Sequence, residues 1–178
     1  TITFNGGNGN AASRVISYAY PTIASYGIVD LNGADYITFK NITVKSTNAN
    51  YGWGFLLRNQ ANYNTIDSCI IDLGSVTTTG SNSIGICVTG SATSWSTTSN
   101  SANYCNFTNN TILGSATGGA YIGISIYGST SAQTDNNKIL IANNTIQDFY
   151  YSGIYTYFYA DSMTVKGNDI SRPNRTGS

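Results

Sequence analysis

The sequence contains no histidine, and every acidic residue is an aspartate because glutamate is absent too. Histidine is the commonest general base and metal ligand in proteins, so its absence removes the residue on which much acid–base and metal chemistry depends. Only 9% of the 178 residues are charged, and the 8 basic side chains balance the 8 acidic ones. Nucleic-acid binding needs clustered lysine and arginine, so we expect no nucleic-acid partner.

Strong helix formers are also scarce. The chain has one methionine and no glutamate, whereas β-branched residues, which favour strands, recur throughout. No run of 18 or more apolar residues occurs in the sequence, so we expect no membrane-spanning helix and no membrane insertion. The composition therefore predicts an all-β protein.

Cysteine is limited to Cys69, Cys87 and Cys105, which cannot all pair with one another. Their spacing fits no metal-binding motif. We expect them to be small buried apolar residues, and the sequence leaves their redox state open. No metal ion or other cofactor is predicted.

What the sequence does contain is a repeated phrase, most complete as Ile-Leu-Ile-Ala-Asn-Asn-Thr-Ile at 139–146. Aligning five copies produces three columns. The first, apolar column is Phe39, Ile66, Phe107, Ile141 and Val165. The second is Asn41, Ser68, Asn109, Asn143 and Gly167, and the last is Val44, Ile71, Ile112, Ile146 and Ile170. Most residues between the columns are polar, which predicts two short strands joined by a bend.

Each copy follows a second phrase, a glycine that opens another apolar strand. The residues after these glycines are Ile28, Phe55, Ile86, Ile124 and Ile154. One glycine strand, a loop and two further strands make one turn of a coil, and the unequal loop lengths are typical of a solenoid with a constant wall. We predict a β-solenoid of about five to six coils.

The Gly-Ile strands followed by Asn-Asn-Thr-Ile resemble the right-handed parallel β-helix, the pectate-lyase-like fold. The resemblance implies a ladder of inward asparagines, and Asn110, Asn144 and Asn168 match it, while Ile42 and Cys69 interrupt it. A buried amide needs partners, and an identical amide one coil away can provide them. The fold hosts lyases, hydrolases and adhesins alike, so it does not settle the function.

The whole chain, 1–178, is expected to form one β-helix domain of a longer protein. Residues 1–25 are interpreted as an incomplete first coil and 173–178 as a tail or linker. The stretch 26–44 also resembles β-helix modules of large exported surface proteins of Bacteroidetes, which are type IX secretion substrates. This resemblance implies an extracellular or cell-surface location, with neighbouring domains of the same protein or the secretion machinery as partners.

The placement of the aspartates in the predicted coils bears on whether the chain holds a catalytic centre. Hydrolases of this fold need two carboxylates about 5–9.5 Å apart, and calcium-dependent lyases need clustered acids. Asp67 and Asp169 share a face but lie three coils apart, about 14 Å, and Asp30 is placed inward beside Leu57. No catalytic residue is predicted. A fragment of a polysaccharide lyase or glycoside hydrolase remains the alternative to a non-catalytic module.

Two columns of the glycine strands are predicted to face outward. One is Leu31, Arg58, Thr89, Tyr127 and Tyr157, and the other is Val29, Leu56, Cys87, Ser125 and Tyr155. Because tyrosine rings stack on sugars, these columns suggest that Tyr127, Tyr155, Tyr157 and Arg58, with Trp95 from the insertion 90–103, bind a polysaccharide or cell-surface glycan. Two structural alternatives stay open: a cross-coil pair of Tyr127 and Tyr157, and burial against a neighbouring domain. The sequence thus favours a rigid stalk or adhesin with weak glycan binding.

Overall fold

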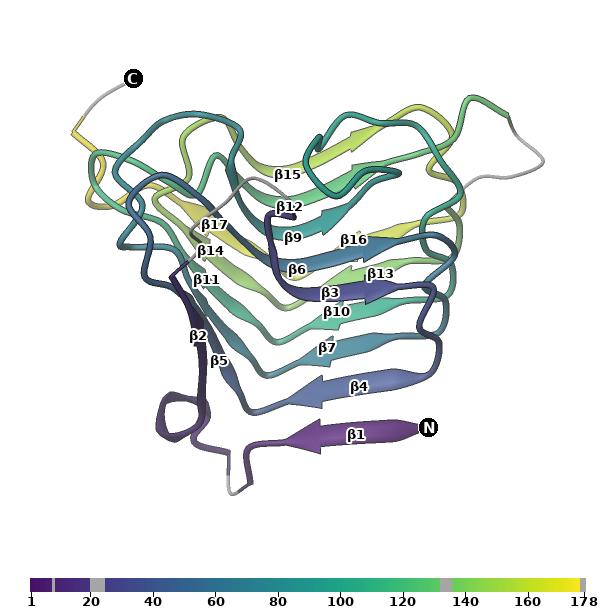
Figure 1. Cartoon of the computed structure of the whole chain (residues 1–178), viewed down its shortest axis with the longest axis horizontal. Helices are drawn as coiled ribbons and strands as arrows, with labels where there is room; N and C mark the ends of the chain where they lie inside the picture. Colours follow the sequence, from purple (N-terminus) through teal and green to yellow (C-terminus); the bar gives the residue numbers. More distant parts are fainter. Residues whose placement is uncertain (8, 20–24, 132–135, 177–178) are drawn as a thin grey trace.

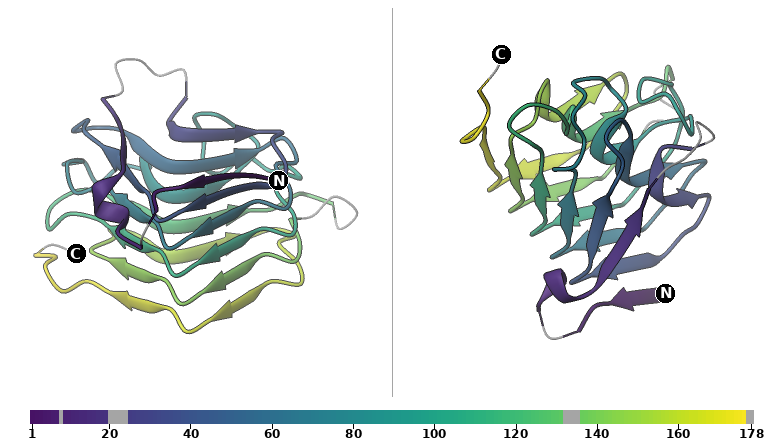
Figure 2. Two further views of the ribbon diagram at one scale, coloured as in Figure 1. Left: turned by 90° about the horizontal axis from the view of Figure 1, so that it is seen from below. Right: turned by 60° about the vertical axis from the view of Figure 1, so that its left-hand side comes forward.

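A computed structural model describes residues 1–7, 9–19, 25–131 and 136–176. The chain is a right-handed parallel β-helix of about six coils, as predicted, in which three parallel sheets form the walls of one tube (Figures 1 and 2). The only helix among the described residues is a three-residue 3₁₀ turn, η1 (Ala11–Ser13). The first strand of each asparagine phrase belongs to sheet A, the second belongs to sheet B, and each glycine strand belongs to sheet C.

Sheet A contains β1 (Ile2–Asn5), β4 (Ile37–Lys40), β7 (Thr65–Asp67), β10 (Asn106–Thr108), β13 (Leu140–Ala142) and β16 (Thr164–Lys166). Sheet B contains β2 (Val15–Tyr18), β5 (Thr43–Ser46), β8 (Ile70–Asp72), β11 (Thr111–Leu113), β14 (Thr145–Gln147) and β17 (Asp169–Ser171). Sheet C contains β3 (Gly27–Asn32), β6 (Gly52–Arg58), β9 (Ser83–Val88), β12 (Ile122–Tyr127) and β15 (Ser152–Tyr157). Every strand pairs with its counterpart one coil away, so unequal loops leave the wall in register.

The bend between sheets A and B falls at the predicted column. Its non-glycine members all adopt positive φ, from 54° at Asn41 and Ser68 to 56° at Asn109 and Asn143, and Gly167 has φ 63°. Asparagine and glycine tolerate this left-handed conformation better than other residues. The repeated Asn at this position therefore has a backbone reason.

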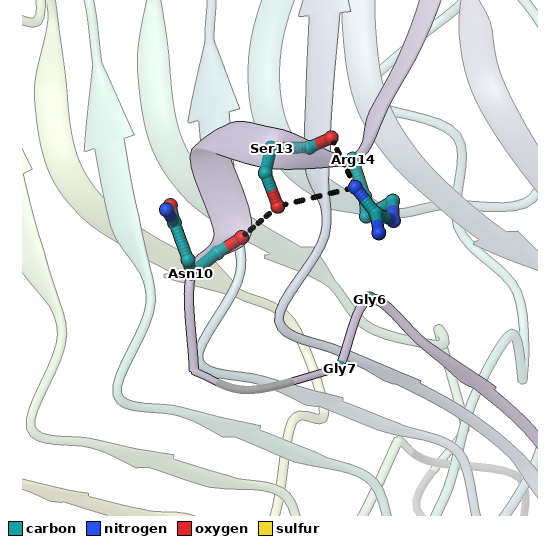
Figure 3. A pocket seen from close by; sticks show the side chains of 5 residues that line it. All are labelled: Gly6, Gly7, Asn10, Ser13 and Arg14. Atoms are coloured by element: carbon teal, nitrogen blue, oxygen red, sulfur yellow. Dashed lines mark hydrogen bonds between the residues drawn. The ribbon is translucent and has the colours of Figure 1, made fainter.

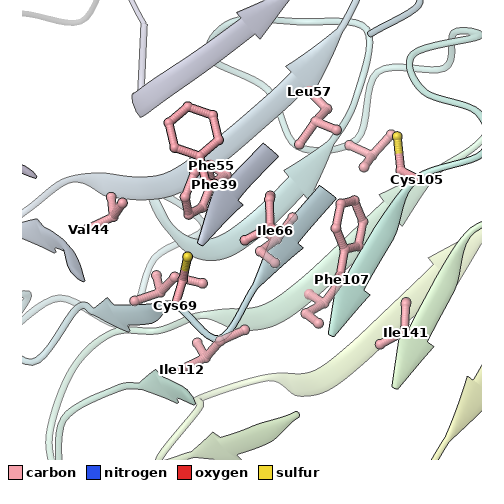
Figure 4. Packing of buried hydrophobic residues seen from close by; sticks show 14 of the residues in the cluster. Phe39, Val44, Phe55, Leu57, Ile66, Cys69, Cys105, Phe107, Ile112 and Ile141 are labelled. Carbon is pink, nitrogen blue, oxygen red and sulfur yellow. The ribbon is translucent and has the colours of Figure 1, made fainter. Parts of the chain in front are cut away.

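A cluster of apolar side chains fills the interior of the tube (Figure 4). The first and last columns meet there, and Ile66, Phe107 and Ile141 of sheet A are fully buried. Sheet C adds Phe55, which packs edge-on against Phe39 with 5.2 Å between ring centroids. Burial of each such side chain contributes about 1.5–3 kcal/mol to the free energy of unfolding, so these interior apolar side chains are the main source of stability.

The glycine column marks the place where sheets B and C come closest. A Cβ at Gly85 would lie 2.7 Å from Cγ2 of Ile112, and one at Gly54 would lie 2.6 Å from the carbonyl oxygen of Gly85. Real Cβ atoms are not found so close to a backbone oxygen. Glycine recurs here because no side chain fits, and not because the strand needs an unusual φ.

Asn110, Asn144 and Asn168 form a continuous ladder along the inside of the bend. The amide Nδ2 of Asn110 donates to Oδ1 of Asn144 at 3.0 Å, and Nδ2 of Asn144 donates to Oδ1 of Asn168 at 2.9 Å. In the preceding coil the column holds Cys69, whose backbone N–H donates to Oδ1 of Asn110 at 3.0 Å. The ladder thus starts one coil beyond Cys69.

Sheet C departs from the predicted alignment in its first strand. Val29 pairs with Phe55 and Leu31 with Leu57, so both side chains point inward and the predicted outward placement is wrong. Asp30 pairs with Leu56 and points outward, contrary to the prediction. The predicted alignment matches Gly27 with Gly54, whereas Gly27 pairs with Trp53. A slip of one residue exchanges the two faces of a strand.

Part of the predicted tail or linker, 173–178, is bonded to the tube. The backbone N–H and Nδ2 of Asn174 both donate to the carboxylate of Asp148 at 2.9 Å. Nη1 of Arg175 donates to three carbonyl oxygens, those of Ser115, Gly118 and Asp148. Residues 177 and 178 of this segment lie outside the described residues.

Among the described residues, three ion pairs link neighbouring coils on the outer surface. In one of them, Nζ of Lys40 lies 3.0 Å from Oδ2 of Asp67. Asp67 also accepts hydrogen bonds from Oγ1 of Thr108 at 2.8 Å and Nδ2 of Asn109 at 2.7 Å. Burial by itself raises the pKa of Asp67, but the bonds from Asn109, Thr108 and Lys40 outweigh it and hold the pKa below its usual value.

Replacement of Asp67 by asparagine is expected to weaken the acid sensitivity of the fold. A carboxyl whose pKa is lowered by folding adds stability above its unfolded pKa of about 4, and that stability is lost as pH falls through the folded pKa. Urea titrations between pH 7 and 2 should therefore show a smaller loss below pH 4 for Asp67→Asn than for the wild type. From about pH 5.5 to 7.5 both stability curves should be flat, since the chain has no histidine. Equal acid losses in the two proteins would contradict this role of Asp67.

Candidate functional site

The outer face of sheet C carries most of the predicted site. Tyr127 of β12 pairs with Tyr157 of β15, and Ser125 pairs with Tyr155. The cross-coil contact between Tyr127 and Tyr157 has 5.5 Å between ring centroids. These tyrosines gather at the C-terminal end of the sheet, over β12 and β15.

The middle of this outer face is covered. Leu56, Cys87 and Trp53 point outward but are fully buried in a second apolar cluster, separate from the one inside the tube. Tyr26, Tyr51 and Trp95 pack on this cluster. Trp53, whose Nε1 donates to the carbonyl oxygen of Ser81 at 3.2 Å, is therefore a structural residue.

The insertion 90–103 contributes Trp95 to this cover and brings its ring to the tyrosines. The Trp95 ring meets Tyr155 edge-on, with 5.2 Å between centroids. It makes similar contacts with Tyr127 at 5.8 Å and Tyr121 at 6.1 Å. The Trp95 ring thus contacts three tyrosines from two neighbouring coils, and Trp95 is itself half-buried.

Around Trp95 the rings form one connected group, which we call the aromatic patch. Its members are Trp95, Tyr121, Tyr127, Tyr151, Tyr155, Tyr157 and Phe158. The most exposed of them are Tyr151 at 55%, Tyr157 at 50% and Phe158 at 49%. Tyr121 and Tyr151 stack with their planes 6° apart. The patch therefore presents several half-exposed rings on one surface.

Arg58 lies apart from the patch. Its Nε and Nη2 donate to the two carboxylate oxygens of Asp30, at 3.1 and 2.9 Å. Between Arg58 and Tyr127 in this column lies Thr89, which is fully buried and whose Oγ1 donates to the carbonyl oxygen of Ser94. The structure thus brings together Trp95, Tyr127, Tyr155 and Tyr157 of the predicted site, and places Arg58 in an ion pair elsewhere.

The hydroxyl groups of Tyr121 and Tyr155 are phenols and not phenolates near neutral pH. Burial raises the pKa of Tyr121, and the neighbouring Tyr151 and Tyr150 raise it further. Burial likewise raises the pKa of Tyr155, with Tyr151, Tyr127, Tyr157 and Tyr121 adding to it. The patch therefore offers neutral O–H donors and apolar ring faces.

A second aromatic feature escaped the sequence alignment. Tyr36, Tyr63 and Tyr104 stack along the turn before sheet A, with centroids 4.8 and 4.7 Å apart and planes within 2° and 7°. Nζ of Lys138 lies 5.1 Å from the Tyr104 ring centroid, in the next coil. All four residues have positive φ. Extending the alignment three residues upstream of its first column would have shown Tyr, Tyr, Tyr, Lys and Ser.

A hollow of about 440 Å³ lies in the first coil (Figure 3). Gly6, Gly7, Asn10, Ser13 and Arg14 line it. Nη1 of Arg14 donates to the carbonyl oxygen of Ser13 at 2.9 Å, and Oγ of Ser13 donates to that of Asn10 at 2.9 Å. Since these polar groups bind each other, the hollow offers no convergent set of groups for a ligand.

The acids and thiols of the described residues are dispersed. No three Cys, Asp, Glu or His side chains in that part of the chain lie close enough to hold a metal ion. Cys69, Cys87 and Cys105 are free and buried. Burial raises the pKa of Cys69 to about 11 and that of Cys105 to about 12, and it raises the pKa of Cys87 well above the usual value. The thiols are therefore protonated and poorly reactive at neutral pH.

Comparison of the chain with models of protein families, with curated proteins and with solved structures finds no match. Within the described residues, no helix has the length and apolar character needed to cross a membrane. The aromatic patch is therefore the feature of the molecule from which a function can be proposed.

Proposed function

We propose that this chain is a non-catalytic β-helix module of an exported or cell-surface protein, which serves as a rigid stalk or adhesin and binds glycan weakly through the aromatic patch. The observation that supports glycan binding is the gathering of half-exposed rings over β12 and β15, with Tyr151, Tyr157 and Phe158 each about half exposed. The likeness of residues 26–44 to modules of exported Bacteroidetes proteins supports the surface location.

Aromatic faces suit sugars because the C–H bonds of a pyranose ring lie against the π-system while phenol hydroxyls bond to sugar hydroxyls. The patch offers both kinds of group, on a scaffold in which β12 is paired on both sides and β15 is paired with β12. Ring placement on strands keeps the distances between the rings constant. A solenoid wall is in this sense a suitable support for a repeating ligand.

The acidic residues favour a binding module over an enzyme. Asp30, Asp67 and Asp72 are each held by a basic side chain of an adjacent coil. Asp148 is held by Asn174. None of these carboxylates has a second carboxylate as its partner, and a glycosidase needs such a pair across the scissile bond.

The double replacement Tyr151→Ala/Tyr157→Ala is expected to reduce glycan-array binding about five- to 150-fold, because two stacking contacts of about 0.5–1.5 kcal/mol each are removed. Tyr36→Asn is the matched control, since Tyr36 is also 50% exposed but belongs to the separate tyrosine stack. Circular dichroism checks that all three proteins are folded. Unchanged binding in the double variant, or no binding by the wild type to any glycan, would refute the proposal.

A further inference from the structure

Ser125, at the centre of β12, has a buried hydroxyl group that no group among the described residues satisfies. The residue is fully buried, and its Oγ has no hydrogen-bond partner in that part of the chain. Buried polar side chains are almost always paired, so such an atom requires an explanation. It lies on the outer face of sheet C, between Cys87 in one coil and Tyr155 in the next.

Trp95 packs against the tyrosines that surround Ser125. Tyr121 immediately precedes β12, Tyr127 ends that strand, and Tyr155 is the neighbour of Ser125 in the next coil. The Trp95 ring contacts all three tyrosines edge-on. It therefore occupies the position from which a ligand would reach Oγ of Ser125.

Residues 90–98, which carry Trp95, are bonded mainly to one another and to Thr89, which directly follows β9. Oγ of Ser91 accepts hydrogen bonds from the backbone N–H groups of Thr93 and Ser94. Oγ1 of Thr89 donates to the carbonyl oxygens of Ser94 and Thr97. The backbone bond from Tyr26 to Ala92 joins this segment to another coil, whereas the insertion from Ser99 onward is bonded to neighbouring coils, as by Ser101 to Asn136. Residues 90–98 can therefore lift without breaking any strand pairing.

We propose that Ser125, Tyr121, Tyr127 and Tyr155 form a binding subsite for one pyranose ring of a neutral glycan, and that Trp95 fills this subsite until the sugar displaces it. This inference rests on the proposed glycan-binding function. An entering sugar hydroxyl supplies the missing partner of Oγ of Ser125, and the sugar ring replaces the indole against the tyrosine rings.

The subsite selects against acidic sugars because none of its four residues is charged. The cation predicted nearby, Arg58, is held bidentately by Asp30 and lies two coils from β12. A uronic acid carboxylate would lose its hydration here without gaining a cationic partner. Neutral hexoses carry no such penalty.

A first test needs no ligand and uses the cysteines of the wild-type protein. Cys87 belongs to the outer cluster on which Trp95 packs, whereas Cys69 and Cys105 belong to the core inside the tube. If the loop opens, Cys87 should be alkylated by iodoacetamide at least about tenfold faster than the other two. Each rate is measured by mass spectrometry and divided by the rate in the unfolded chain. Equal normalised rates for all three would show that only global unfolding exposes Cys87, and would overturn the displacement of Trp95.

The second test compares binding of neutral and uronic-acid oligosaccharides by Trp95→Ala, Trp95→Ala/Ser125→Ala and the wild type. Removal of the competing indole should strengthen binding of neutral oligosaccharides about tenfold, and loss of the Ser125 hydroxyl should cancel this gain. Weaker or equal binding by Trp95→Ala beside a wild type that binds would overturn the subsite but leave the proposed function intact. Exclusive binding of uronic acids would overturn the neutral class. No binding by any of the three proteins would overturn both proposals.

Discussion

Replacement of Asn144 by alanine is expected to lower the free energy of unfolding by about 4 kcal/mol, because the middle of a buried amide ladder is lost. Oδ1 of Asn144 accepts from the backbone N–H and from Nδ2 of Asn110, each at 3.0 Å. Its Nδ2 donates to the carbonyl oxygen of Phe107 and to Oδ1 of Asn168, each at 2.9 Å. Asn144 is only 1% exposed, so water cannot replace these bonds without opening the wall.

The measurement is urea unfolding followed by circular dichroism. Asn106→Thr is the control: it changes an asparagine on the outer side of β10, between Thr65 and Leu140, and should alter stability by no more than about 0.5 kcal/mol. Asn168→Ala should give an intermediate loss, since Asn168 is only half-buried. A loss below about 1 kcal/mol for Asn144→Ala would show that the ladder contributes little to stability.

Replacement of Gly123 by alanine is expected to destabilise the fold by about 3 kcal/mol, because the added methyl group has no space. It would overlap with the carbonyl oxygen of Gly153 and with Cγ2 of Ile146. The first obstacle is backbone of the neighbouring coil, which cannot rotate away as a side chain can. Relief requires β12 to move away both from β15 of its own sheet and from the Ile146 side chain of sheet B.

Gly80→Ala is the matched control for Gly123→Ala. A Cβ at Gly80 would meet nothing closer than Nδ2 of Asn82 at 4.0 Å, and Gly80 is exposed. This variant should be neutral or more stable by about 0.4–1 kcal/mol, since alanine restricts the unfolded chain. Thermal unfolding of both variants shows whether glycine is required at position 123 because of close packing or because of backbone flexibility. Equal effects at the two positions would exclude close packing.

The sequence was sufficient for the parts of this fold that repeat. The alignment placed the bend at the column of Asn41, Asn109 and Asn143, where φ is positive, and it placed the first apolar column directly before that bend. Each of these features follows from a local requirement that recurs in every coil. Because the requirement recurs, the same residue preference appears in several copies of the repeat and can be recognised in the sequence even where each copy alone is weak.

The alignment failed where a local ambiguity had no repeat to resolve it. In the first glycine strand, Ile28 and Val29 are both apolar, so Gly27 can be matched with Gly54 or with Trp53. Only the pairing of β3 with β6 decides that Leu31 faces inward and Asp30 outward. Arg58 could not be assigned correctly for the same reason, because its partner Asp30 was placed on the wrong face.

The covering of sheet C had no sequence pattern to predict it. The 90–103 insertion has no counterpart of equal length in the other coils, so no column indicates where Trp95 lies. Leu56 and Cys87 were placed correctly on the outer face, but their burial depends on contacts with residues far away in the chain. Such tertiary contacts join distant parts of the chain, and the periodicity of the sequence does not predict them.

The unequal coil lengths have a mechanical consequence. Hydrogen-bonded positions one coil apart are separated by 27, 41, 34 and 24 residues in successive coils. The bonds between coils run along the axis of the tube, so an axial pull loads them directly, one layer at a time. A coil that is peeled away releases about 80 Å of extended chain for the shortest repeat and about 140 Å for the longest. The length of each extension step would therefore identify the coil that had left the stack, so that the order of rupture could be read from a force–extension trace.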